Sequence, residues 1–275
     1  MRPDEIALAA DWAAAEGWNP GLADTACFAT VDPAGFLIGE LDGAPAATIS
    51  CVNYDARFAF LGFYIVRADL RGRGYGLRMW SAAIAHAGTR VVGLDGVVAQ
   101  QQNYRKSGFA LAYANIRYGG TIAASPAPPD AISLAEVPFA AVEADDATVF
   151  PAPRAAFLRA WIDTPGHVGR ALVRDGKLAA WGVIRPCRTG CKIGPLVADD
   201  RAAAEGVFRA GRGGGRRRGL PRRAGGEPRR GRARARPGSC AGVRDRADVY
   251  RGDPSAAARS RVRRHHVRAG MISYR

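Results

Sequence analysis

Three glycines at alternate positions lie where an apolar segment ends and a helical pattern begins. The stretch is Val66-Arg67-Ala68-Asp69-Leu70-Arg71-Gly72-Arg73-Gly74-Tyr75-Gly76, preceded by a strand-like segment (60–66) and followed by a helix-like one (77–86). Glycine permits positive φ angles and close approach of a ligand, and the unpaired N–H groups of a helix N-terminus attract anions. The stretch is therefore typical of a phosphate-binding loop.

The spacing excludes two common phosphate loops. A nucleoside-triphosphate loop ends in Gly-Lys-Ser/Thr, which is missing here, and the dinucleotide fingerprint G-x-G-x-x-G requires a glycine where the chain has Leu77. What remains is Arg-Gly-x-Gly-x-Gly after a strand. The alternative interpretation is an ordinary strand-to-helix turn with incidental glycines.

A second motif follows downstream. In Asn103-Tyr104-Arg105-Lys106-Ser107-Gly108-Phe109, Tyr104 stands four residues before a Gly-Phe pair. Together the two motifs resemble the acetyl-CoA pyrophosphate loop and the tyrosine-bearing helix of the GNAT family of N-acetyltransferases. Segments 60–66, 93–100 and 115–118 resemble, more narrowly, a bacterial group of GNAT proteins in which a degenerate GNAT-like half follows the first domain.

The resemblance implies a role for each matching residue. The loop would hold the pyrophosphate of the cosubstrate acetyl-CoA, the strand end would pair with its pantetheine arm, Asn103 would add a contact, and Tyr104 would protonate the departing thiolate. The residues of the loop are Arg71, Gly72, Arg73, Gly74, Tyr75 and Gly76, and those of the strand end are Tyr64, Ile65 and Val66.

The general base is open at this stage. Asp95 lies at a strand end and is a candidate, although an acid at that position can equally cap a neighbouring helix. Glu16, Asn53 and Asp55 are candidates for lining an amine pocket, and His86 is interpreted as a surface or packing histidine. No metal is expected.

The elements that must position these residues alternate in type. The patterns predict helices over 4–16, 22–28, 77–86 and 100–107, and strands over 35–41, 46–52, 58–66, 91–96 and 108–113. This order resembles the GNAT fold, an α/β (α+β) structure. The resemblance implies a mixed, mostly antiparallel sheet with flanking helices, whose central parallel strands splay apart to admit the cofactor.

The chain is expected to divide into four parts. Residues 1–120 form the acetyltransferase domain, 121–130 a proline-containing linker, and 131–208 a partial, degenerate second half. In that half we expect helical or loop segments over 132–150, a helix over 154–162 and a hairpin over 169–184. No glycine loop follows its strand at 191–198, so we expect no second active site.

The last part, 209–275, accounts for all of the net positive charge. It contains 21 arginines and 4 acidic residues, whereas the whole chain has a net charge of +15. Such a composition cannot bury a core, so we expect disorder. A nucleic-acid-binding arm is one interpretation, but Tyr250 and Tyr274 are its only aromatic residues.

A shifted reading frame is the interpretation we favour for this part. With suitable synonymous codons, reading one nucleotide later converts 220–229, 243–250 and 254–271 into amphipathic sequences that look like the end of the same two-domain group. Nucleic acid is then not an expected partner.

Composition sets the remaining expectations. No apolar run approaches the roughly 20 residues that span a bilayer, so we expect a cytoplasmic protein that does not bind membranes. The five cysteines are expected to be free thiols. The expected activity is acetyl transfer from acetyl-CoA to a primary amine of a small molecule or peptide by direct attack. The alternatives are an acyl-CoA-binding protein without turnover and a nucleic-acid binder.

Overall fold

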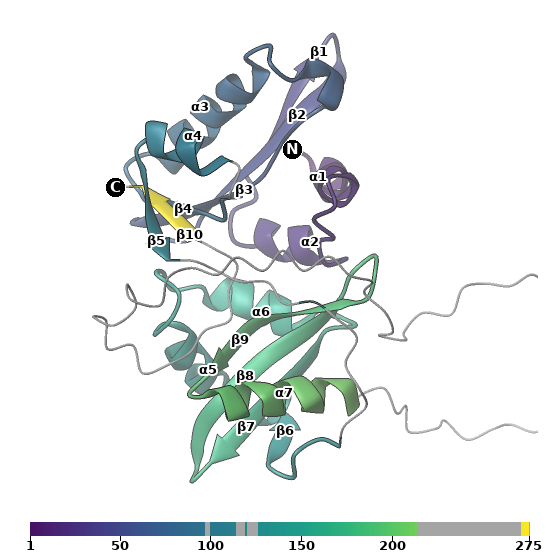
Figure 1. The fold of residues 1–275 in the computed structure, drawn as a ribbon, viewed down its shortest axis with the longest axis vertical. Coiled ribbons are helices and arrows are strands. Elements are labelled where there is room, and N and C mark those ends of the chain that lie inside the picture. Colours follow the sequence, from purple (N-terminus) through teal and green to yellow (C-terminus); the bar gives the residue numbers. More distant parts are fainter. Residues whose placement is uncertain (97–99, 114–118, 120–125, 214–270, 275) are drawn as a thin grey trace, which may run out of the picture.

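The structure is a computed structural model that describes residues 1–96, 100–113, 119, 126–213 and 271–274. Figure 1 shows two sheets, one above the other along the long axis, each with helices packed on it. The upper sheet has six strands in the order β1-β2-β3-β4-β10-β5, and the lower one has four in the order β6-β7-β8-β9.

The upper half follows the expected element order. Its helices are α1 (Pro3–Ala15), α2 (Asp24–Ala29), the short 3₁₀ turn η1 (Ala68–Leu70), α3 (Tyr75–Ala87) and α4 (Gln101–Lys106). Its strands are β1 (Phe36–Leu41), β2 (Ala44–Asn53), β3 (Phe58–Val66), β4 (Val91–Leu94), β5 (Phe109–Tyr113) and β10 (Met271–Tyr274). Neighbouring strands of this sheet are antiparallel, except that β3 and β4 are parallel. The expected mixed, mostly antiparallel sheet is confirmed.

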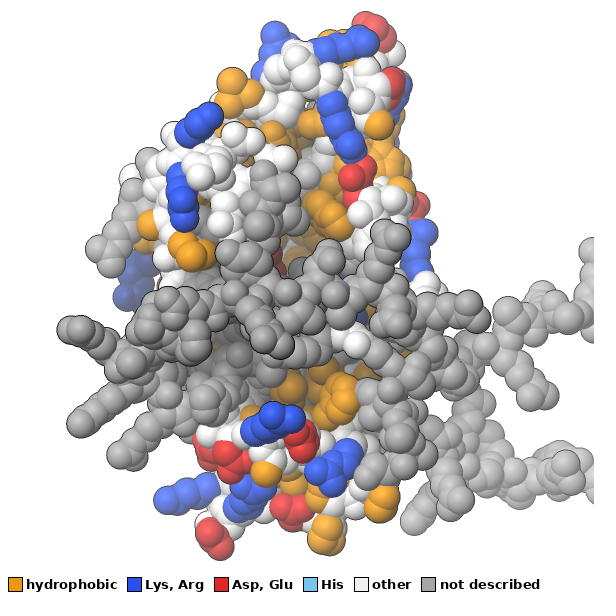
Figure 2. All heavy atoms as spheres, viewed as in Figure 1, with side chains coloured by type: hydrophobic (Ala, Val, Ile, Leu, Met, Phe, Trp, Pro, Cys, Tyr) orange, Lys and Arg blue, Asp and Glu red, His pale blue; other side chains and the backbone are white. Residues whose placement is uncertain are grey.

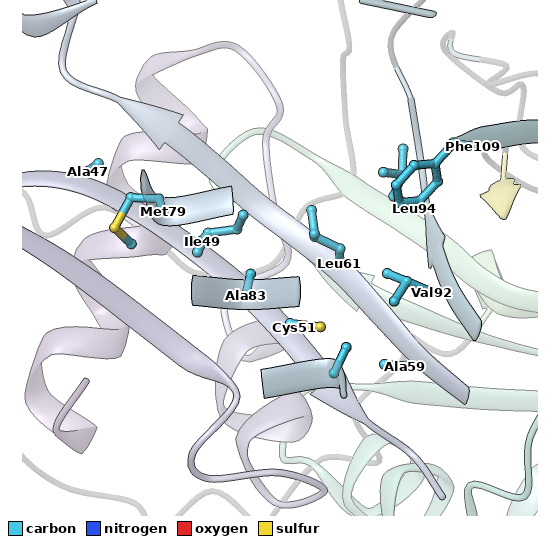
Figure 3. Close-up of a cluster of buried hydrophobic side chains, with 11 residues drawn as sticks. Ala47, Ile49, Cys51, Ala59, Leu61, Met79, Ala83, Val92, Leu94 and Phe109 are labelled. Atoms are coloured by element: carbon cyan, nitrogen blue, oxygen red, sulfur yellow. The ribbon is translucent and has the colours of Figure 1, made fainter. Parts of the chain in front are cut away.

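α3 covers one face of this sheet. Figure 3 shows Met79 and Ala83 of α3 above alternate residues of β2, Ala47, Ile49 and Cys51. Side chains two apart on a strand share a face, so β2 presents these three to α3. This apolar contact fixes the direction in which the N-terminus of α3 points.

α1 and α2 lie on the opposite face (Figure 1). Ile6 of α1 packs with Phe36 and Val52, and the rings of Phe28 and Phe63 contact this cluster. The central strands are thus covered on both faces, as their nearly continuous apolar sequence requires.

The lower half is built in the same way. Its helices are η3 (Leu134–Glu136), α5 (Phe139–Asp146), α6 (Ala155–Asp163) and α7 (Arg201–Gly213), and its strands are β6 (Ala131–Ser133), β7 (Val168–Arg174), β8 (Lys177–Pro186) and β9 (Cys191–Ala198). α7 packs on one face through Ala203 and Val207. α5 and α6 cover the other through Val142 and Trp161.

The two halves share a core. Cys27 and Phe28 of α2 pack with residues of the lower half, and the Phe28 ring stacks on Phe157 at 5.1 Å between centroids. Beside them, Arg185 Nε of β8 donates to Asp24 Oδ1 of α2 at 2.7 Å. α2 is therefore fixed to the lower half.

Three features differ from the sequence expectations. β6 forms within a segment expected to be helical or loop. α7 continues past residue 208 to Gly213, and Ala210 is buried. Met271–Tyr274, within the stretch expected to be disordered, form β10 between β4 and β5. The proposed frame shift concerns mainly residues 214–270, which lie outside the described residues.

Candidate active site

β3 carries a bulge just before its end. Gly62 and Ile65 of β3 are paired with residues of β2. Between these two pairs, β3 has two residues where β2 has one. Phe63 lies in this gap with φ at 47°, a left-handed value that is uncommon for a bulky residue. Thr48 Oγ1 donates to the Phe63 carbonyl oxygen at 2.9 Å. We did not predict the bulge, and Gly62 inside an apolar strand was its one sequence signal.

Beyond the bulge, β3 separates from β4. The last pair of the two strands is Leu61 with Leu94, whereas β3 continues to pair with β2 as far as Val66. Within the described residues, the β4-facing edge of β3 has no strand partner after Leu61. Because unpaired backbone groups need hydrogen-bond partners, this segment suits an extended ligand. Tyr64, Ile65 and Val66, the predicted pantetheine-binding residues, lie on it.

The glycine loop follows directly. Gly72 and Gly74 have φ of 76° and 82°, which glycine adopts without strain. Gly74 is the N-cap residue of α3, and among the described residues no side chain caps this helix. The first turn of α3, which begins at Tyr75, contains no acidic residue. The N–H groups and the positive end of the helix dipole therefore suit an anion.

Gly76 serves a different purpose from the two glycines before it. A Cβ at this position would lie 2.5 Å from Tyr64 Oη. The missing side chain thus lets the Tyr64 phenol lie against the first turn of α3.

Arg71 is engaged within the chain. Its Nε donates to the Val66 carbonyl oxygen at 2.9 Å, and its Nη2 forms an ion pair with Glu16 at the end of α1. Arg73 is exposed. Glu16, considered for the amine pocket, therefore links α1 to the loop.

Tyr104 lies in an aromatic cluster beside the separated strands. Its ring stacks on Trp80 of α3 (6.0 Å between centroids, 26° between planes), and Trp80 also contacts Tyr64 at 5.7 Å. Phe109 completes the cluster, at 6.3 Å from Tyr104 and 5.5 Å from Trp80. Burial raises the pKa of the Tyr104 phenol, and the Tyr64 phenol adds to the rise. The structure thus brings together Tyr104 and Tyr64, and Trp80 is a residue that we did not single out.

The other predicted residues lie at the surface. Asp95 follows the last residue of β4 and is exposed. Asn103 is also exposed, and its Nδ2 donates to Gln100 Oε1 at 2.7 Å.

Figure 2 shows hydrophobic side chains exposed on the visible face of the upper half, between the regions of α3 and α1.

His86 is at the far end of α3 from the glycine loop. Its Nε2 lies 2.7 Å from Oδ2 of Asp32, a buried residue that we did not single out. The same Asp32 oxygen accepts from the Asn53 backbone N–H at 2.9 Å. Asp55 Oδ1 accepts from the Arg57 and Phe58 N–H groups. The Asn53 Nδ2 donates to the His86 carbonyl oxygen at 3.1 Å, so the side chains of Asn53 and Asp55 both form hydrogen bonds within the chain.

The corresponding helix of the lower half begins differently. Asp200, directly before α7, accepts from the Ala203 N–H at 2.6 Å and forms an ion pair with Arg174 at 3.0 Å. The Ala203 N–H bond, followed by the Arg174 contact, holds the pKa of Asp200 below its usual value. A carboxylate therefore already occupies this helix N-terminus.

Within the part of the chain that the structure describes, the remaining titratable groups form no metal site. Among the described residues, no three histidine, cysteine or acidic side chains are grouped as a metal would require, and no helix is both long and apolar enough to cross a membrane. Cys27, Cys51 and Cys187 are free and buried. Cys191 is in a disulfide, so the expectation of free thiols is wrong for this residue.

Comparison with known proteins gives matches in both halves of the chain. Residues 6–109 match the model of the acetyltransferase (GNAT) family, and residues 142–216 match that of an acetyltransferase (GNAT) domain. The chain is 35% identical over 207 residues to the holothin acyltransferase of Pseudoalteromonas sp. (strain SANK 73390), covering 74% of this chain and 70% of that protein.

A solved structure shows the same fold. A Pyrococcus horikoshii protein named as an acetyltransferase superposes with a TM-score of 0.64 at 21% identity, over 77% of this chain and 74% of that one. The protein is therefore an acyltransferase that belongs to the GNAT family, with a GNAT region in each of its two halves.

Proposed function

We propose that the protein transfers an acetyl group from acetyl-CoA to a primary amine by direct attack. The observation that carries the proposal is the uncapped N-terminus of α3, with its glycine loop, directly beside the unpaired edge of β3. One element suits the pyrophosphate and the other the pantetheine arm and thioester of the same ligand.

The cofactor contacts follow from this arrangement. The N–H groups of Gly72, Arg73, Gly74, Tyr75 and Gly76 bind the pyrophosphate, and exposed Arg73 adds positive charge. The Arg71 N–H is already bonded to the Ala68 carbonyl oxygen at 3.4 Å. The edge from Tyr64 to Val66 binds the pantetheine arm and offers N–H groups to the thioester carbonyl. Asn103 contacts the cofactor from α4.

The reaction then needs one nucleophile, one acid and one base. The neutral amine attacks the thioester carbonyl, and the N–H groups of β3 stabilise the negative charge that develops on the carbonyl oxygen. The C–S bond breaks, the sulfur keeps its electrons, and the Tyr104 phenol gives its proton to the thiolate. The proton lost by the nitrogen passes to a base, for which we propose Asp95 acting through water.

The acceptor is proposed to be a small-molecule amine. The relative with 35% identity is named for acyl transfer to holothin, which favours a small molecule over a peptide. Acyl-CoA is the donor typical of the family. Comparing transfer rates from acetyl-CoA and from longer acyl-CoA thioesters tests whether acetyl is the group that is transferred.

Gly74→Val tests the loop. Valine at a φ of 82° is strained by about 1–3 kcal/mol, and its side chain enters the space above the helix N-terminus. We expect acetyl-CoA affinity, measured by calorimetry, to fall about tenfold or more. Gly176→Val is the matched control, because Gly176 has φ of 72° and equally open space in the β7–β8 turn.

Two results would count against the proposal. Unchanged acetyl-CoA affinity in Gly74→Val removes the loop as the binding site. Binding by the unaltered protein without transfer to any amine of a broad panel indicates an acyl-CoA-binding protein.

A further inference from the structure

The strained residue of the β3 bulge has a specific partner. Phe63 is held at a φ of 47°, a conformation that costs a bulky residue about 1–3 kcal/mol and persists only where its surroundings enforce it. Such residues gather at sites where the strain places a functional group. A contact of the Phe63 backbone must therefore stabilise this conformation.

Thr48 makes that contact. It is fully buried on β2, and its Oγ1 donates to the Phe63 carbonyl oxygen at 2.9 Å. A bulge turns one residue out of the regular ladder, so this carbonyl takes its hydrogen bond from a side chain. Thr48 is the last residue before the register shift, and Ile65 is its partner across the strands.

The position of Thr48 is unusual for a polar residue. Val52, on the same face of β2, packs in the apolar cluster with Phe36 and Phe63. Valine has nearly the shape of threonine and lacks only the hydroxyl, so packing alone does not require threonine here. The hydroxyl matters because it reaches the bulge.

We propose that Thr48 is a positioning residue for acyl transfer, whose hydroxyl holds the Phe63 bulge so that the unpaired edge of β3 presents its N–H groups to the thioester carbonyl. This inference rests on the proposed function. In this proposal Thr48 acts through the backbone of Phe63 and does not touch the reacting atoms.

Thr48→Val removes the hydrogen bond and keeps the shape. The N–H groups bind the developing oxyanion more strongly than the ground-state carbonyl, so the loss appears in the chemical step. We expect kcat to fall about tenfold or more, with the acetyl-CoA Kd within about twofold of the original. Thr48→Ser should restore kcat, because serine supplies the same donor.

A spectroscopic measurement needs no acceptor. The carbonyl stretch of acetyl-CoA labelled with ¹³C at the carbonyl should move to lower frequency on binding, because the N–H groups polarise the bond. Thr48→Val should reduce this shift and Thr48→Ser should keep it. Thr164→Val is the control, because it removes the same kind of bond, Thr164 Oγ1 to the Ala160 carbonyl at 2.5 Å, in the lower half.

A second variant separates positioning from packing. Glycine adopts a left-handed φ without help, so in a Phe63→Gly background the bulge no longer needs Thr48. The effect of Thr48→Val on the carbonyl shift and on kcat should then disappear. A persistent effect in that background would mean that Thr48 acts through packing and would overturn the proposal.

The outcomes also distinguish the two proposals. A protein that binds acetyl-CoA but acylates no amine contradicts the proposed function, while the carbonyl shift still tests Thr48. A Thr48→Val protein with a normal melting temperature, carbonyl shift and kcat contradicts the role of Thr48. If Thr48→Val alone does not fold, the comparison is made between Phe63→Gly and the double variant.

Discussion

The surroundings of the Tyr104 phenol raise its pKa. Trp80 stacks on its ring, Phe109 closes one side, and the Tyr64 phenol lies near enough to disfavour a second negative charge. Burial, the larger cause, raises the pKa of Tyr104 above the usual value of about 10. At neutral pH the group is protonated, as an acid for a departing thiolate must be.

Tyr104→Phe tests this role through its pH dependence. We expect kcat to fall about a hundredfold, the low end for a general acid, because a thiolate leaves readily. In the unaltered protein the acid is lost as the pH rises through the raised pKa, so kcat should decline on the alkaline side. The variant has no phenol to ionise at this position, so this decline should be missing from its profile.

The matched control is Tyr75→Phe, since Tyr75 lies at the start of α3 outside the aromatic cluster. It should keep the alkaline decline. A Tyr104→Phe enzyme with unchanged kcat and the same decline would assign the acid to another group.

At the scale of elements, the two halves contain the same unit with different helix starts. In each, a strand leads into a helix that packs back on the sheet, β3 into α3 and β9 into α7 (Figure 1). Gly74 leaves the N–H groups of α3 without a side-chain cap, whereas Asp200 caps α7. A carboxylate at that position repels a phosphate and occupies a donor that it would need.

This difference predicts one acyl-CoA site per chain. Calorimetric titration with acetyl-CoA should give a stoichiometry of one, and Gly74→Val should weaken that single binding event about tenfold or more. A stoichiometry of two would place a cofactor on α7 as well.

Sequence patterns were most informative where local chemistry decides the structure. The structure contains the strands expected over 35–41, 46–52 and 58–66 and the helix expected over 77–86, and the glycine-rich segment connects the last of these strands to that helix. The Phe63 bulge was missed because a strand with one extra residue keeps its apolar composition. Its cause, the Thr48 hydrogen bond, joins residues that no local pattern relates.

The contacts of Tyr104 and Arg71 show a similar limit. Tyr104 could be singled out from a motif, but its stacking on Trp80 depends on how α3 and α4 meet. The engagement of Arg71 by Glu16 depends on where α1 ends. β10 was missed because its strand pairs with residues far away in the sequence, and such pairing leaves no local signal.

At the scale of the whole molecule, the second half contributes part of the first half's support. α2 packs its Cys27 and Phe28 into the lower core, and a hydrogen bond joins the Leu22 N–H to the Pro186 carbonyl at 3.0 Å. Arg188 of the lower half also forms an ion pair with Asp11 of α1, the helix that precedes Glu16. A frame shift after residue 208 would leave these contacts in place because all of them precede it, and sequencing the gene tests whether the shift exists.

The Asp24–Arg185 ion pair joins the two halves, and removing it tests how much this contact contributes to stability. Both side chains are largely buried (9% and 14% exposed), Asp24 also accepts from the Gly21 N–H at 2.9 Å, and the Arg185 guanidinium lies 4.7 Å from the Trp161 ring centroid. Arg185→Ala leaves a buried carboxylate without its cation. We expect the free energy of unfolding, measured by urea denaturation, to fall by about 3–5 kcal/mol.

The control and the compensating variant make this prediction specific. Arg174→Ala breaks the exposed pair with Asp200 (42% and 52% exposed) and should cost no more than about 1 kcal/mol. Asp24→Asn in the Arg185→Ala background should recover part of the loss, because it removes the unpaired charge. If Arg185→Ala costs no more than Arg174→Ala, the halves are held together by their apolar core alone.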